Sequence, residues 1–209
     1  MQAIRSIYPG EEVTTSYILP HHSYAERVDR TTRQWGFRCT CNLCSAPPQI
    51  ISASDDRLLL IQHLEKQMAN ITVDRAVGPS TAEFLVSLYT QERLDGAIAE
   101  AYSYAALEYA YAADRHMAQK YAALAVEALV ILRGPRYFAT HSFNEMLAYP
   151  ERHAAWNLTA ILRDRDAKRP EEQIKEVVGG VEEAVPGEDH TAGKTDGEKK
   201  KDEKLWYWS

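Results

Sequence analysis

The chain has 209 residues, of which 45% are hydrophobic and 26% charged, an ordinary soluble composition with room for one domain or for a small domain plus an appendage. The formal net charge of -6 argues against a nucleic-acid-binding surface spread over the whole chain. No apolar run approaches the ~20 residues of a membrane span, and the N-terminus lacks the order of a signal peptide. Three cysteines, an odd number, fit a reducing compartment. We therefore expect a cytoplasmic or nuclear protein without direct membrane or nucleic-acid partners.

The first region, residues 1–49, opens with loosely alternating apolar residues, which are Ile4, Ile7, Val13, Tyr17 and Leu19. Pro9 and Gly10 in "YPGEE" favour a turn, because proline restricts φ and glycine tolerates positive φ. The alternation predicts a short strand on either side of this turn.

A helix is predicted in "SYAERVDRTTRQWG". Ser23 and Glu26 form a capping-box pattern, and Gly36 suits the position just past the helix end. The helix carries arginines at a spacing of three, namely Arg27, Arg30 and Arg33. Such a stripe indicates a solvated helix face.

Residues 50–165 read as helical throughout. Asp55 and Asp56 are expected to open a helix with Ile61, Leu64 and Met68 on one side. Ser80 and Glu83 form a second capping-box pattern. Two further helices follow, in "DGAIAEAYSYAALEYAYAADR" and "HMAQKYAALAVEALVILRGP", with a connection so short that they should pair antiparallel.

The last two helices carry a tyrosine-rich stripe, which is typical of a helix-packing core; a peptide-binding groove is the alternative. The pair resembles a tetratricopeptide-type unit loosely, but no second copy occurs at a period of ~34 residues. From residue 166 to 209 the sequence is charged and poor in large apolar residues, which predicts a disordered tail. Its final "LWYWS" reads either as a docking tag or as a product of an inaccurate gene model.

All three cysteines fall within six residues, as Cys39, Cys41 and Cys44. Thiolates at the spacing C-x-C-x-x-C can converge on one zinc ion, which favours four ligands in a tetrahedron. One ligand must then come from elsewhere, and the histidine candidates are His21, His22 and His63. The alternatives are three free surface thiols, or one disulfide with a leftover thiol.

The order "AIRSIYPGEEVTTSY", an arginine-bearing helix and "WGFRCTCNLC" resembles the C-terminal end of a SET domain and its post-SET zinc segment, in the form found in the SET-and-MYND class. The resemblance covers residues 3–44, and the helices weakly. It implies a protein-lysine methyltransferase that uses S-adenosylmethionine. It also implies that Tyr17 lines the lysine channel as a catalytic and cofactor-binding residue, that Phe37 packs on the adenine ring, and that Cys39, Cys41 and Cys44 bind zinc.

In that family a fourth cysteine, from an upstream Asn-His-x-Cys segment, completes the zinc site. That segment and the glycine-rich cofactor strand are absent from this sequence. We therefore expect the C-terminal portion of a lysine methyltransferase, inactive as a truncated chain, whose complete protein would act on a histone or non-histone lysine. The alternative is a non-enzymatic module whose helices bind a peptide or partner and whose zinc loop is vestigial.

The expected fold is mixed and mainly α. It comprises a short β-containing SET remnant with a zinc loop at residues 1–49, a tetratricopeptide-like all-α region at 50–165, and a disordered tail at 166–209.

Overall fold

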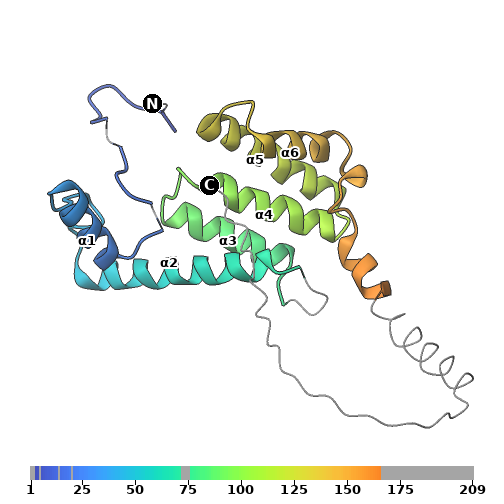
Figure 1. The fold of residues 1–209 in the computed structure, drawn as a ribbon, viewed down its shortest axis with the longest axis horizontal. Coiled ribbons are helices and arrows are strands. Elements are labelled where there is room, and N and C mark those ends of the chain that lie inside the picture. The colour runs from blue at the N-terminus through green and yellow to red at the C-terminus, as the bar shows by residue number, and fades with distance from the viewer. Residues whose placement is uncertain (1–2, 5, 14, 20, 72–75, 166–209) are drawn as a thin grey trace, which may run out of the picture. The chain divides into compact units, whose positions relative to one another are not determined.

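The computed structural model describes residues 3–4, 6–13, 15–19, 21–71 and 76–165. The chain divides into two units, Met1–Arg169 and Pro170–Ser209, and everything described belongs to the first (Figure 1). The predicted disordered tail lies outside the described residues. The helices in chain order are α1 (Tyr24–Trp35), α2 (Pro48–Ala69), α3 (Pro79–Gln91), α4 (Ile98–Tyr111), α5 (Arg115–Arg133), α6 (Phe138–Ala148) and the short 3-10 helix η1 (Pro150–Arg152). Residues 158–165 are also helical.

The β-containing remnant predicted for residues 1–49 is wrong, because the described part of the chain contains helices, turns and irregular segments but no strand. The turn at Pro9 and Gly10 does form: the Glu11 amide donates to the Tyr8 carbonyl over 3.0 Å, and Gly10 has a φ of 84°. A strand requires a partner that accepts its backbone hydrogen bonds. Alternation alone cannot supply that partner, and the apolar side chains beside the turn remain exposed.

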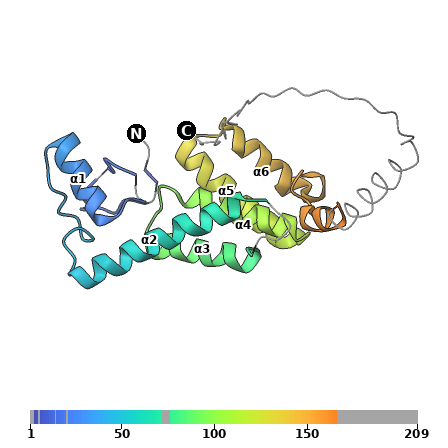
Figure 2. The ribbon, with the colours of Figure 1, turned by 60° about the horizontal axis from the view of Figure 1, so that its bottom comes forward.

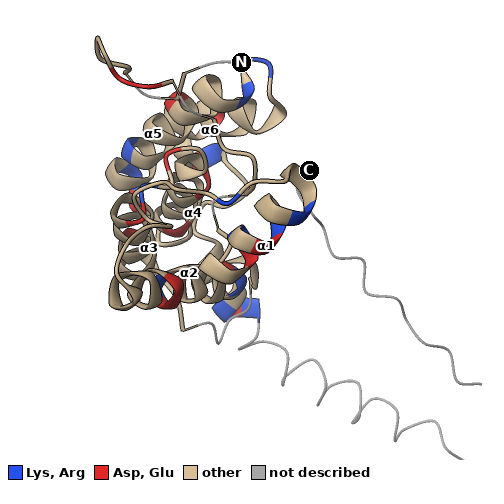
Figure 3. Ribbon diagram, turned by 90° about the vertical axis from the view of Figure 1, so that its left-hand side faces the viewer, with Lys and Arg blue, Asp and Glu red and all other residues tan. Residues whose placement is uncertain are grey.

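Helix α1 begins and ends where the sequence predicts. Ser23 caps it, with its backbone amide bonded to the Glu26 carboxylate at 2.8 Å and its hydroxyl bonded to the Glu26 amide at 3.4 Å. Gly36 ends the helix with a φ of 71°, a left-handed conformation that glycine adopts more readily than residues with a side chain. Basic and acidic residues are interspersed along α1 (Figure 3). The solvated arginine face is partly wrong, since Arg30 and Arg33 are exposed but Arg27 is buried.

Helix α2 begins at Pro48, so the expectation that Asp55 and Asp56 open it is wrong. Proline is favoured in the first helical turn, where its missing N–H is not needed. The predicted apolar side is confirmed, because Ile61, Leu64 and Met68 are all buried. The predicted boundary between residues 49 and 50 falls inside the first turn of α2, and the domain limits stay a prediction.

Helix α3 begins at Pro79 after Gly78 and has no side-chain cap, so the second capping box is wrong. Proline at the start already places Ser80 inside the first turn, and the Glu83 carboxylate accepts a hydrogen bond from the Tyr121 hydroxyl instead, at 3.1 Å. The stability of this helix therefore depends on its buried face, which includes Leu85 and Tyr89.

From α2 to α6 each helix packs on the next helix along the chain, with the most extensive contact between α4 and α5 (Figures 1 and 2). The core of this pair is built from alanines, which let the two backbones approach closely: Ala101, Ala105, Ala118, Ala122 and Ala125. Tyr121 is buried and stacks on Tyr109 with ring centroids 5.7 Å apart, so the tyrosine stripe does pack against this core. Among the described helices, none is long and apolar enough to cross a membrane.

Candidate functional site

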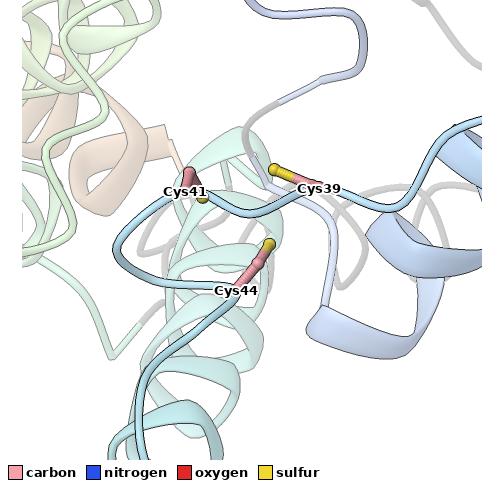
Figure 4. Close-up of side chains that lie close together, drawn as sticks. All are labelled: Cys39, Cys41 and Cys44. Carbon is pink, nitrogen blue, oxygen red and sulfur yellow. The ribbon is translucent and has the colours of Figure 1, made fainter.

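The three cysteines lie in the loop between α1 and α2, and their sulfur atoms turn toward one space (Figure 4). The Sγ atoms of Cys39, Cys41 and Cys44 all lie within 4.8 Å of one another, and all three are free thiols. The loop closes through the Ser45 amide, which donates to the Cys41 carbonyl at 3.0 Å. This short turn is what brings residues two and five positions apart to one point.

The three thiols could bind a metal ion, and thiolates are among the ligands that zinc prefers. Zinc–sulfur bonds of about 2.3 Å in a tetrahedron place the sulfurs about 3.8 Å apart, so the thiols would have to move together by about 1 Å at most. Their burial differs, because Cys44 is only 9% exposed whereas Cys41 is exposed. A metal held here would therefore have one buried ligand, Cys44, one half-buried ligand, Cys39, and one exposed ligand, Cys41.

The thiols also differ in their tendency to ionise. Burial raises the pKa of the Cys44 thiol to about 11, and an interaction with the Arg27 guanidinium opposes that rise. Burial acts in the same direction on Cys41, but hydrogen bonds from the Cys44 backbone and from the neighbouring thiols outweigh it and lower the Cys41 pKa. The exposed Cys41 thiol is therefore easier to ionise than the buried Cys44 thiol.

No histidine, aspartate or glutamate in the described ranges joins the three thiols as a fourth ligand. His63 is exposed on α2, and His22 lies 3.9 Å from the Glu26 carboxylate, with its pKa lowered chiefly by burial. His21 is held by Tyr89 at 3.1 Å. The three histidine candidates are thus placed elsewhere, and the source of a fourth ligand stays a prediction.

The structure brings Tyr17 and Phe37 together, although they are twenty positions apart. Their ring centroids are 5.3 Å apart in an edge-on contact, and Tyr17 makes a similar contact with Trp35 at 5.1 Å. Phe37 is placed by the end of α1, where its amide donates to the Thr31 carbonyl over 3.2 Å. Tyr17 and Phe37 are 51% and 37% exposed, so both rings are open to a ligand at the start of the cysteine loop.

A second polar cluster, which sequence reasoning missed, holds the segment before α1 against the helices. The Tyr89 hydroxyl of α3 donates to the Glu65 carboxylate of α2, and it lies 3.1 Å from His21 Nε2. Glu100 of α4 is 3.4 Å from the same hydroxyl. We call His21, Glu65, Tyr89 and Glu100 the Tyr89 cluster. The signal available in the sequence was Glu65 itself, a carboxylate beside the apolar stripe of α2.

The ligand atoms of His21, Glu65 and Glu100 lie within 4.8 Å of one another, which would also suit a cation. The Tyr89 hydroxyl already bonds to members of this group, so hydrogen bonds within the protein account for its geometry. Its evident consequence is mechanical: it joins three helices to the segment that carries Tyr17.

Comparison with known proteins identifies similar sequences over part of the chain. The chain is 34% identical over 74 residues to Histone-lysine N-methyltransferase set5 of Schizosaccharomyces pombe, a match that covers 35% of this chain and 23% of that protein. It is 45% identical over 42 residues to Histone-lysine N-methyltransferase SET5 of Meyerozyma guilliermondii, a match that covers 20% of this chain and 9% of that protein. The corresponding protein of Scheffersomyces stipitis is 40% identical over 48 residues, covering 23% and 10%.

These partial similarities support a relation to SET-domain methyltransferases. The matches span less than a quarter of each of these relatives. No protein-family model matches the sequence, and no solved structure matches it.

Proposed function

We propose that this chain carries the C-terminal end of the SET domain and the post-SET metal loop of a protein-lysine methyltransferase, in the form of the SET-and-MYND class. The observation that carries the proposal is the contact between Tyr17 and Phe37 next to the three-thiol cluster. The resemblance assigns Tyr17 and Phe37 to one active site. The proposal therefore requires the two rings to lie close together, as they do. The similarity to Set5 proteins supports the same reading.

Methyl transfer is an in-line displacement in which S-adenosylmethionine, when bound, supplies the methyl group on its sulfonium. The lysine amine must arrive uncharged and aligned, so positioning accounts for much of the rate. We assign this positioning to the Tyr17 hydroxyl, a rigid polar atom at the end of a ring held by two aromatic neighbours. A hydrogen-bond acceptor there stabilises the partial positive charge that develops on the transferred group.

Phe37 is assigned to the adenine side of the cofactor, where an aromatic face contributes packing. Its backbone lies between the end of α1 and Cys39, so both its orientation and that of the metal loop depend on the same short segment. Zinc held by Cys39, Cys41 and Cys44 would supply a structural cross-link. Its contribution would be to keep the Phe37 ring in place, with no role for the metal in the chemistry.

The substrate class that follows is a lysine in a histone or another protein, and the expected location is the cytoplasm or nucleus. We test the proposal with the chain joined in frame behind the N-terminal half of a SET domain. Calorimetric titration measures S-adenosylmethionine binding, and a methyl-transfer assay on histone and non-histone proteins measures turnover. We expect both in the joined protein.

The decisive variant is Tyr17→Phe, with Tyr8→Phe as the matched control because Tyr8 is also an exposed tyrosine of the same segment. Removal of a hydrogen bond that forms mainly in the transition state lowers turnover tenfold for about each 1.4 kcal/mol added to the activation free energy. Cofactor affinity changes little, because the bond is not made in the ground state. We expect Tyr17→Phe to lower turnover by at least about tenfold and Tyr8→Phe to leave it unchanged. Full activity of Tyr17→Phe would remove the role that we assign to this residue. A joined protein that folds but binds no cofactor would favour the alternative, a helical interaction module.

A further inference from the structure

Arg27 is a buried cation in an unusual position. It faces inward from α1 and is only 8% exposed, whereas Arg30 and Arg33 of the same helix are exposed. Its Nη1 donates to the His22 carbonyl over 2.6 Å. Its Nε and Nη2 atoms are buried and have no hydrogen-bond partner in the described part of the chain. A buried guanidinium with two unused donors costs free energy unless a further group compensates it.

The acidic residues nearest in sequence on α1 are already engaged. Glu26 bonds to Ser23 at the helix start, and Asp29 pairs with Arg33 at 2.6 Å. Besides His22, the Arg27 guanidinium interacts with the Cys44 thiol, the buried member of the three cysteines. A neutral thiol is a weak hydrogen-bond acceptor and carries no charge, so it compensates Arg27 poorly.

Metal binding would change that balance. When three thiols bind Zn²⁺, three protons leave and the complex carries one net negative charge, most of it on the sulfurs. Cys44 then presents a thiolate, which accepts N–H donors strongly and supplies the missing negative charge. Metal binding would therefore give the unused N–H donors of Arg27 an acceptor. The positive charge of Arg27 would in turn balance the negative charge of the metal–thiolate complex.

We propose that Arg27 is a positioning residue of the metal centre, whose Nε–H and Nη2–H groups donate to the metal-bound thiolate of Cys44. This inference rests on the metal loop of the proposed function and names the residue that tunes it. Partners that donate to metal ligands from outside the coordination sphere typically change metal affinity by about 10- to 100-fold. Arg27 supplies both charge and direction, and a lysine in its place would supply mainly charge.

The test uses the full chain with Co²⁺ and Zn²⁺ as probes. The variants are Arg27→Met, which keeps length without charge, and Arg27→Lys, which keeps charge without the planar donor pair. Arg30→Met is the matched control, an exposed arginine one turn along the same helix. The readouts are metal affinity by chelator competition, the energy of the sulfur-to-cobalt charge-transfer band, and the melting temperature with and without metal.

We expect Arg27→Met to weaken zinc binding by about 10- to 100-fold, Arg27→Lys to fall between it and the native chain, and Arg30→Met to remain within about twofold. Loss of N–H donation makes the Cys44 sulfur a better electron donor, so the cobalt band should move to lower energy in Arg27→Met. The melting temperature should fall mainly for the metal-loaded chain.

Two results would overturn the inference, and they are distinguishable. If the native chain binds neither metal, the metal loop of the proposed function fails and Arg27 loses its role with it. If the native chain binds metal but Arg27→Met keeps its affinity and its cobalt spectrum, only the role of Arg27 fails. An equal fall in melting temperature with and without metal, at unchanged affinity, would mark Arg27 as a purely structural residue.

Discussion

Replacement of Tyr89 by phenylalanine probes the cluster that joins the segment bearing Tyr17 to the helices. Tyr89 is fully buried, so the substitution removes one oxygen and leaves the ring in place. The lost hydroxyl donates to Glu65 and lies 3.1 Å from His21 Nε2. The substitution leaves both partners, which are half-buried, without this hydroxyl.

The size of the effect follows from these partners. A hydrogen bond to a charged group contributes about 1.5–3 kcal/mol, because its removal leaves a poorly solvated charge. The side chains of His21 and Glu65 are 20% and 23% exposed, and His21 Nε2 lies 4.0 Å from Glu65 Oε1. Water and a direct interaction between these two side chains therefore offset part of the lost free energy. We expect Tyr89→Phe to lower the free energy of unfolding by about 1–2 kcal/mol, or the melting temperature by about 2–8 °C.

The effect should depend on pH in a defined direction. Burial raises the pKa of Glu65, and the Tyr89 hydroxyl opposes that rise by bonding to the carboxylate. In Tyr89→Phe the folded-state pKa rises further above the unfolded value. Stability linked to a raised carboxyl pKa is present below the unfolded pKa and is lost as pH rises through the folded pKa. The variant should therefore lose more stability at about pH 7 than at about pH 4.

The assay is thermal and urea unfolding of the full chain, followed by circular dichroism, with limited proteolysis of the segment before α1 as a second readout. The matched control is Tyr149→Phe, a half-exposed tyrosine outside the Tyr89 cluster, which should unfold like the native chain. An unchanged melting temperature together with unchanged cleavage before α1 would refute the account of this cluster. Equal destabilisation at both pH values would refute the part assigned to Glu65.

Three further changes test other parts of the fold. Leu85→Ala empties a fully buried position of α3 and should cost about 2–5 kcal/mol in urea unfolding, whereas Leu59→Ala at an exposed position of α2 should cost less than about 0.5 kcal/mol. Ser23→Ala removes the cap of α1 and should cost about 1 kcal/mol, and no loss of stability or helicity would show that the cap is redundant. Burial lowers the pKa of His153, so the stability that this histidine contributes is present above its unfolded pKa of about 6.5 and is lost as pH falls through its folded pKa. His153→Gln should therefore flatten this part of the curve of unfolding free energy against pH. An unchanged curve would contradict this expectation.

What the sequence determined by itself is local. The capping box of Ser23 and Glu26 and the stop at Gly36 involve residues within a few positions of one another, so the chain needs nothing distant to form them. The apolar stripe of α2 follows from helical periodicity in the same way. The clustering of the three thiols is also local, since a single short loop brings them together.

Tertiary structure decided what depends on a partner far along the chain. The stretches beside Gly10 alternate like strands but do not pair, because pairing requires a second strand and periodicity cannot provide one. The Tyr89 cluster draws on three helices and the loop before α1, so no window of sequence contains it. Spacing put Arg27 on one face with two exposed arginines, yet the fold buries it and brings its guanidinium to the Cys44 thiol. Burial is set by which surfaces meet, and that information is absent from any single helix.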